Sequence, residues 1–313
     1  MEVKVSISVI MLTYNRERML SHMIESILNQ TFDDFEFIIV DNGSTDCSGR
    51  IAEEYASRYS QIRVVHIKKG SIGKGRNVGL SVASGKYVAF VDDDDTCEVT
   101  YLGRLYTSLN GAENEVSICG TNRSCGNCSI IFSGKEALEA LLDRKYFNVG
   151  FPTKLIPREL FNIEQFREDV RFDDIYLMPI IIANAKRVHY IAAPLYQVNR
   201  HEGNNSAWTT DYHLLTESIL REYMDVYEKR TVWLCEKYPE SSLLWEYYKW
   251  SFYISMVQKI HKYQLEKCYV VCRRMETDLR QNRDEFLMSP KIQPFEKEWM
   301  EKLVDCDDIH GHI

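Results

Sequence analysis

The feature that most constrains the fold is a repeated switch, over residues 5–91, between short β-branched runs and stretches with helical periodicity. This alternation is typical of a parallel sheet wound with helices, and it predicts an α/β fold. The predicted strands are nearly continuous in apolar residues, as strands buried on both faces should be. They span residues 5–12, 35–40, 62–67 and 87–91.

Helices are expected between these strands. The first carries apolar side chains at three-to-four spacing over residues 19–28, which form one stripe facing the sheet. The second is predicted to begin at Ser44 or Thr45, because either hydroxyl can cap free backbone amides. The third is predicted to run from about Arg76 to near Gly85, since glycine suits a helix end.

Four adjacent carboxylates, Asp92, Asp93, Asp94 and Asp95, directly follow the fourth predicted strand. Ligands bind beyond the carboxyl ends of parallel strands, so this run should lie in a crevice lined by the loops after all four strands. Two unit charges about 4 Å apart repel by roughly 4 kcal/mol at an effective dielectric constant of about 20. A hard dication such as Mg²⁺ or Mn²⁺ would relieve the repulsion and bridge to substrate phosphates, whereas the alternative is a solvated acidic turn.

Two further loops at the same edge carry polar groups suited to a nucleotide. Asp41 follows the second strand, and its carboxylate can accept the N3–H of uracil, a donor that cytosine lacks. Residues 68–76 form a basic, glycine-rich segment that includes Lys74 and Arg76 and can approach phosphate. The glycine spacing of a Walker loop or a dinucleotide fingerprint is absent, and residues 13–18 contain no glycine, which disfavours a dehydrogenase.

The second half of the chain divides in two. Residues 134–206 mix a helix over residues 135–142 with short apolar segments and should complete the crevice, whereas from about Thr209 onward the sequence reads as helices. We therefore expect one α/β domain over residues 1–206 and a helical region over residues 207–313. Residues 245–256 are rich in aromatic side chains, which suggests core packing or a homodimer interface. Contact with a membrane surface is the alternative.

Composition narrows the class of protein. The net charge of -8 argues against a general nucleic-acid binder. The chain opens directly into a strand without a cleavage site, and no apolar run reaches the roughly 18 residues of a membrane span. We expect a cytoplasmic protein, at most peripheral at the inner face of the plasma membrane, with reduced cysteines. Cys119, Cys125 and Cys128 raise the alternative of a zinc site, but a fourth ligand is missing, and cysteines in a hairpin around Gly120 and Gly126 are the favoured interpretation.

These segments together resemble glycosyltransferase family 2, the inverting enzymes with a GT-A (nucleotide-diphospho-sugar transferase) fold, over roughly residues 6–206. The matching segments appear in the family's order: residues 7–15, which end in Tyr-Asn; the Val-Asp-Asn-Gly-Ser of residues 40–44; the Arg-Asn-Val-Gly of residues 76–79; and the Asp-Asp-Asp of residues 92–94. By this resemblance Tyr14 lies against the base, Asp41 contacts uracil, Asp92 approaches the ribose and Asp94 binds the metal. We also assign Leu12, Asp93, Lys74 and Arg76 to the nucleotide site.

The resemblance also implies a catalytic base. Residues 154–161 look like the segment that precedes the family's Glu-Asp motif, which here becomes Asp173-Asp174. We prefer Asp174 as the base, because an apolar helix follows it at the family's spacing. Asp169, in the literal Glu168-Asp169 pair, is the alternative. His201 lies where relatives close the active site and is a candidate third metal ligand.

The resulting hypothesis is an inverting glycosyltransferase that moves a sugar from a UDP-sugar, with Mn²⁺ or Mg²⁺, to a hydroxyl of a glycan or lipid-linked acceptor in cell-surface polysaccharide biosynthesis. Asp174 would remove the acceptor proton while the metal stabilises the leaving diphosphate. A nucleotidyltransferase and a catalytically silent sugar-nucleotide-binding protein remain as alternatives.

Overall fold

The protein is described by a computed structural model that covers residues 5–124, 126, 128–200 and 211–308. Two compact units are present, residues 1–200 and residues 201–313. The domain boundary expected between residues 206 and 207 lies outside the described residues. Each unit is described separately below.

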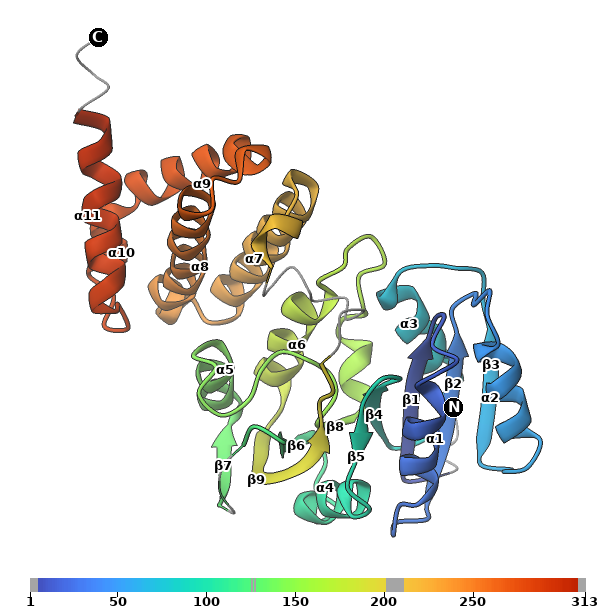
Figure 1. The fold of residues 1–313 in the computed structure, drawn as a ribbon. Coiled ribbons are helices and arrows are strands. Elements are labelled where there is room, and N and C mark those ends of the chain that lie inside the picture. Colours follow the sequence, from blue (N-terminus) through green and yellow to red (C-terminus); the bar gives the residue numbers. More distant parts are fainter. Residues whose placement is uncertain (1–4, 125, 127, 201–210, 309–313) are drawn as a thin grey trace. The chain divides into compact units, whose positions relative to one another are not determined.

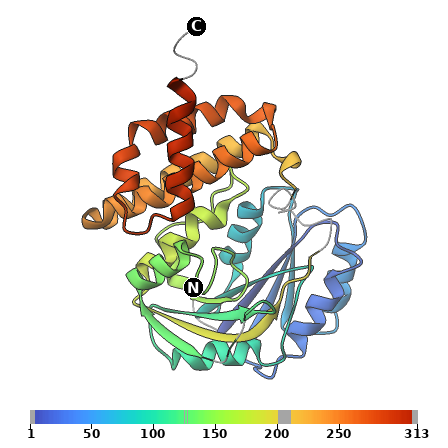
Figure 2. The ribbon, with the colours of Figure 1, turned by 60° about the vertical axis from the view of Figure 1, so that its left-hand side comes forward.

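The first unit is an α/β structure built on one twisted sheet (Figures 1 and 2). Within the described residues the strand order is β3-β2-β1-β4-β8-β6-β9-β5, and β7 pairs with β9. The strands are β1 Ile7–Thr13, β2 Phe35–Asp41, β3 Ile62–His66, β4 Tyr87–Asp92, β5 Thr96–Cys97, β6 Glu115–Thr121, β7 Ser129–Ser133, β8 Lys154–Pro157 and β9 Arg187–Gln197. The predicted strands are thus confirmed as the parallel part of the sheet, β3-β2-β1-β4.

Helices cover both faces of this parallel part. The helices of the unit are α1 Leu20–Leu28, α2 Ser48–Ala56, α3 Ile72–Val82, α4 Tyr101–Leu109, α5 Gly134–Leu142 and α6 Asp173–Asn184. One hydrophobic core joins the buried stripe of α1 and residues of α2 and α4 to one set of alternate strand residues, such as Val9 and Met11. Helix α3 packs against the other set, where Ile10 lies beside Gly79.

Two predicted helix starts are wrong. Helix α2 begins at Ser48 instead of Ser44 or Thr45, because the hydroxyl of Ser44 accepts a hydrogen bond from a neighbouring loop and does not cap the helix. Helix α3 begins at Ile72, since the Ser71 side chain accepts the Lys74 N–H at 3.1 Å and caps the helix four residues earlier than predicted.

The predicted end of α3 and the predicted hairpin are also wrong. Helix α3 ends at Val82, and the N–H of Gly85 instead donates to the Ser8 hydroxyl of β1 at 2.8 Å. Strands β6 and β7 both pair with β9 and not with each other. Cys119 is buried in β6, Cys128 is exposed, and Cys125 lies outside the described residues.

The second unit is helical in its described part, as predicted, and α8 forms its core. Its helices are α7 Glu217–Lys237, α8 Ser242–Lys262, α9 Tyr269–Gln281, α10 Arg283–Leu287 and α11 Pro294–Asp308. The aromatic segment lies on α8, and Trp245, Trp250 and Tyr253 are buried within the unit. Among the described residues, no helix combines the length and the apolarity that a bilayer crossing requires.

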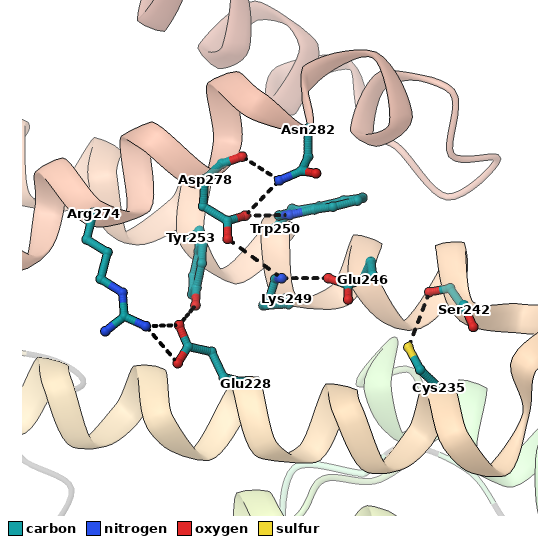
Figure 3. Close-up of polar contacts among 10 residues, drawn as sticks. All are labelled: Glu228, Cys235, Ser242, Glu246, Lys249, Trp250, Tyr253, Arg274, Asp278 and Asn282. Atoms are coloured by element: carbon teal, nitrogen blue, oxygen red, sulfur yellow. Dashed lines mark hydrogen bonds and ion pairs between the residues drawn. The ribbon is translucent and has the colours of Figure 1, made fainter.

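Polar contacts tie three helices of this unit together (Figure 3). Glu228 of α7 accepts hydrogen bonds from the Tyr253 hydroxyl of α8, at 3.0 Å, and from Arg274 of α9, at 2.8 and 3.0 Å. The indole N–H of Trp250 donates to Asp278 at 2.8 Å. These bonds fix the packing of α7, α8 and α9.

Candidate functional site

Strand register brings the predicted functional segments to one edge of the sheet. Thr13 of β1 pairs with Asp41 of β2, and Leu12 pairs with Asp92 of β4. Asp41 in turn pairs with His66 at the end of β3. The loops that follow these strands therefore begin side by side, as the sequence predicts.

Hydrogen bonds join the loop after β1 to the loop after β2. Asn15 adopts a left-handed backbone with φ of 53°, which asparagine tolerates better than most residues. Its N–H donates to the Ser44 hydroxyl at 3.1 Å, and its side-chain oxygen accepts the Thr45 N–H at 2.8 Å. The Arg16 N–H donates to the Ser48 hydroxyl at 2.8 Å. The polar residues of the second loop thus fix the first loop and form one wall of the edge.

Asp41 is buried and held in one orientation. One carboxylate oxygen accepts the Ser44 N–H at 3.0 Å, and the other contacts Nδ1 of His66 at 2.9 Å. Burial alone would raise the pKa of Asp41, but its bonds to Ser44 and His66 hold that pKa below the ordinary value. The bonds to Asp41 and Glu53 raise the pKa of His66. Asp41 is therefore an ionised acceptor, and its carboxylate can accept a further hydrogen bond besides those from Ser44 and His66.

Asn42 fixes the start of the basic segment. Its side-chain amide donates to the carbonyl of Gly70 at 3.0 Å and accepts the N–H of Gly70 at 2.9 Å. An aspartate could make only the second bond, so the asparagine at this position has a structural reason. The neighbouring Lys69 ammonium donates to the Tyr14 hydroxyl at 2.7 Å and lies 4.1 Å from the ring centre. Tyr14 and the basic segment thus share one surface.

Gly73 and Gly75 of the glycine-rich segment lie inside α3 and are not part of a phosphate-binding loop. A Cβ atom on Gly75 would lie 2.5 Å from a methyl carbon of Leu12, and one on Gly73 would lie 2.1 Å from the carbonyl oxygen of Arg167. These glycines therefore serve close packing. Lys74, in the first turn of α3, is exposed and remains able to reach an anion near the helix N-terminus.

The acidic run after β4 places several carboxylates in one tight turn. Burial raises the pKa of Asp93 to about 7, even though Arg16 lies 3.6 Å away. Burial likewise raises the pKa of Asp95 to about 7, although one of its oxygens accepts the Asn199 N–H at 2.7 Å. Asp94 is partly buried between them. The donor set consists of carboxylate oxygens, which fits a hard divalent cation.

Arg76 is the centre of the site. Its guanidinium donates to the carboxylate of Asp173 at 2.9 Å, and both side chains are largely buried. Burial opposes its charge, but Asp173, Asp92 and Asp174 outweigh that effect and raise the pKa of Arg76. Carboxylates from the end of β4 and the start of α6 are thereby brought around one cation from α3.

Aromatic rings enclose this arginine on its apolar sides. The centres of Phe90, Phe151 and Phe166 lie 5.8, 5.2 and 5.4 Å from the guanidinium carbon. Rings exclude water and strengthen the ion pair with Asp173. The predicted nucleotide role of Arg76 remains a prediction, because its guanidinium is hydrogen-bonded to Asp173.

The structure separates the two candidates for the base. Asp174 lies in the first turn of α6, and burial together with Asp173 raises its pKa to about 6, with Arg76 opposing. Asp169 is exposed and pairs with Arg167 at 2.6 Å. Asp174 is thus the candidate that adjoins the Arg76 cluster. Its raised pKa suits a group that must gain a proton near neutral pH.

Several residues near the site were not predicted from the sequence to contribute to it. The Tyr196 hydroxyl, fully buried on β9, accepts the N–H of Asp92 at 3.0 Å and supports the acidic turn. Lys154 of β8 is completely buried, and burial lowers the pKa of its ammonium to about 7. Asp92 itself is accessible to solvent. His201, the candidate metal ligand, lies outside the described residues.

Comparisons with known proteins agree on one class of enzyme. Residues 8–168 match the family described as glycosyl transferase family 2. Glycosyltransferase GlyG of Streptococcus pneumoniae is 32% identical over 242 residues, 72% of this chain and 79% of that protein. A cholesterol galactosyltransferase of Borreliella burgdorferi is 33% identical over 261 residues, 72% of each chain.

Solved structures share the fold. The crystal structure of S. aureus TarS 1-349 in complex with UDP-GlcNAc has a TM-score of 0.60 and 20% identity, covering 88% of this chain and 92% of that chain. The chain spans 40% of the length of a longer S. aureus TarS structure. At this level of identity the likeness establishes the GT-A type of α/β fold.

Proposed function

This chain belongs to glycosyltransferase family 2 and is a glycosyltransferase, and we propose that it transfers a sugar from a UDP-sugar to an acceptor hydroxyl with inversion of the anomeric configuration. The observation that carries the proposal is the cluster of Asp92, Asp173 and Asp174 around Arg76. This cluster brings Asp92, at the strand end expected to hold the donor, and Asp174, a carboxylate suited to act as a base, around the same arginine.

The donor side is suited to uridine. Asp41 is ionised and oriented by His66, and a carboxylate in this state accepts the uracil N3–H. Tyr14 offers a ring against which the base can stack, next to Leu12, and Lys74 can neutralise phosphate. The UDP-GlcNAc held by the TarS structure supports the choice of a UDP-sugar.

Asp94, with Asp92 and Asp93 beside it and His201 as a further ligand, would hold Mn²⁺ or Mg²⁺. The carboxylate oxygens gathered in this turn are the hard donors that such an ion prefers. When bound, the ion supplies positive charge that stabilises the departing diphosphate. Asp92 remains accessible to the ribose hydroxyls.

Asp174 acts as the general base. It accepts the proton of the acceptor hydroxyl as that oxygen bonds to the anomeric carbon, while the bond from this carbon to the UDP oxygen breaks. Arg76 holds Asp173 in its pair and keeps positive charge near both carboxylates. A single displacement of this kind needs one base and no protein nucleophile, so the configuration inverts.

The names of two relatives support a proposal for the acceptor class. One acts on cholesterol by its name, and another, from Bacillus subtilis, is a minor teichoic acid biosynthesis protein. We infer a lipid-linked or cell-surface glycan acceptor, approached from the cytoplasmic side of the membrane. A homodimer through the helical unit stays a prediction.

Calorimetric titration of UDP in the presence of Mn²⁺ tests the donor site. Asp94→Ala should abolish the metal-dependent part of UDP affinity and leave the fold intact, because the change removes one ligand and also relieves carboxylate repulsion. Asp33→Ala, which removes an exposed carboxylate before β2, is the matched control and should bind as the wild type does. Unchanged metal-dependent affinity in Asp94→Ala would refute the assignment.

A further inference from the structure

Three potential metal ligands converge in the helical unit, outside the proposed active site. His261 lies in the last turn of α8, and Cys272 and Glu276 lie one turn apart on α9. Their donor atoms, Nε2, Sγ and Oε1, all lie within 4.8 Å of one another. Among the residues that the structure describes, no other group of three such side chains was found this close.

The spacing of these atoms is near that of a tetrahedral metal site. With metal–sulfur bonds of about 2.3 Å and metal–nitrogen or metal–oxygen bonds of about 2.0 Å, tetrahedral angles separate sulfur from nitrogen or oxygen by about 3.5 Å. The Sγ atom of Cys272 is 3.8 Å from Nε2 of His261 and 3.6 Å from Oε1 of Glu276. Two of the three distances between ligand atoms are therefore close to those of a tetrahedral site without any rearrangement.

The third pair of ligand atoms is joined by a hydrogen bond. Nε2 of His261 and Oε1 of Glu276 are 2.6 Å apart, which is a hydrogen-bond distance. A shared metal would hold these atoms about 3.3 Å apart, so a shift of roughly 0.7 Å at the flexible end of a side chain is needed. The half-exposed side chain of His261 has room for that movement.

Burial and neighbouring charge also suit a bound ion. Cys272 and Glu276 are buried, whereas His261 is open to solvent and offers an entry path. The second oxygen of Glu276 lies 3.9 Å from Arg280, which leaves Oε1 directed at the other two ligands. Outer groups that orient a ligating carboxylate in this way are typical of metal sites.

We propose that His261, Cys272 and Glu276 bind a borderline transition-metal dication such as Zn²⁺, with water as the fourth ligand. A thiolate, an imidazole and a carboxylate together favour zinc over Mg²⁺ or Mn²⁺, so this site differs in metal preference from the acidic turn of the first unit. Because its ligands come from α8 and α9, the ion cross-links two helices and stabilises the helical unit.

Affinity for the metal should rise with pH. The metal must displace the thiol proton and also the proton shared by His261 and Glu276. Binding therefore weakens in acid.

Cobalt titration of the reduced full-length chain tests the proposal. Co²⁺ bound by a thiolate gives a near-ultraviolet sulfur-to-metal charge-transfer band, and a tetrahedral site gives strong visible bands, whereas cobalt on carboxylates alone gives neither. We expect both signals to saturate at one Co²⁺ per chain and to disappear when Zn²⁺ is added. Zinc should also raise the thermal unfolding midpoint of the wild type.

Three variants decide the outcome. Cys272→Ser should remove the charge-transfer band, and His261→Ala, at a half-exposed position where folding is not at risk, should weaken cobalt affinity at least about tenfold. Cys235→Ser is the control, because Cys235 lies on α7 with its thiol directed at the carbonyl of Ser242 (Figure 3). Absence of the band at saturating cobalt, or its persistence in Cys272→Ser, would overturn the proposal.

Discussion

Replacing Asp174 with asparagine should abolish sugar transfer and leave donor binding intact. The amide has nearly the shape of the carboxylate, so the first turn of α6 and the Arg76–Asp173 pair are preserved. It cannot accept the proton of the acceptor hydroxyl, and loss of a general base typically lowers the rate by about 10²- to 10⁴-fold. UDP affinity should change little, because the donor contacts are assigned to other residues.

The pH dependence of kcat provides a second quantitative test of the role of Asp174. Burial and Asp173 raise the pKa of Asp174 to about 6. The base works only when ionised, so kcat in the wild type should be level above that pH and fall about tenfold for each pH unit below it. The residual activity of Asp174→Asn should not show this fall at low pH.

The assay is initial-rate transfer with saturating UDP-sugar, paired with calorimetric UDP binding, for Asp174→Asn and for Asp169→Asn. Asp169 is the matched control, since its carboxylate is exposed, and an ion pair made by an exposed carboxylate contributes at most about 1 kcal/mol. If Asp174→Asn remains active while Asp169→Asn is inactive, the choice of base is wrong. If both variants lose UDP binding, the assignment of donor binding and proton acceptance to different residues is wrong.

Three further perturbations test other parts of the site. Arg76→Met leaves Asp173 buried without its partner and should lower the free energy of unfolding by about 3 to 5 kcal/mol in urea titrations, whereas Asp169→Asn, at an exposed carboxylate, should change it by under about 1 kcal/mol. His66 has a raised pKa, so its pair with Asp41 stabilises the fold fully below about pH 6.5 and is lost as pH rises through the folded pKa. His66→Gln should therefore destabilise the protein more at about pH 5.5 than at about pH 9, and an equal loss at both would contradict the pairing. Competition binding should show UDP favoured over CDP by roughly 1 to 3 kcal/mol, with the preference reduced in Asp41→Asn, while dTDP reports whether the ribose 2′-OH is read.

The parallel run β3-β2-β1-β4 was predictable because its strands are short apolar runs, although only β1, β2 and β4 are buried on both faces, whereas β3 is partly exposed. Continuous apolar runs identified β1, β2, β3 and β4, and the rule for strand ends then placed Asp41 and Asp92 at one edge. The antiparallel insertion of β8 between β4 and β6 was not predicted. The sequence of residues 154–157 does not indicate which strands they pair with, since strand pairing depends on the whole chain.

Local errors came from residues whose partners are distant in sequence. Ser44 and Thr45 have the chemistry of helix caps, but Asn15 from the neighbouring loop takes both of them. Gly75 appeared to belong to a phosphate loop, whereas contact with Leu12 explains it. A single sequence does not encode such long-range competition in any local pattern.

The choice between Asp174 and Asp169 shows what the resemblance added. The literal Glu-Asp pair at residues 168–169 was the simpler match, yet Asp169 is exposed and Asp174 adjoins Arg76. Spacing to the apolar helix that follows favoured Asp174. The ion pair between α3 and α6 had no signature in sequence, because its two residues are 97 positions apart.

The most direct test of the central claim is a donor-hydrolysis screen with Mn²⁺ over UDP-, GDP-, CDP- and dTDP-sugars, with the released sugar followed by proton NMR. Slow hydrolysis of the donor requires no acceptor, so the unknown acceptor does not limit the measurement. The account predicts that a UDP-sugar is the preferred substrate and that the sugar is first released with inverted anomeric configuration. Preference for a GDP- or CDP-sugar, or release with retained configuration, would contradict it.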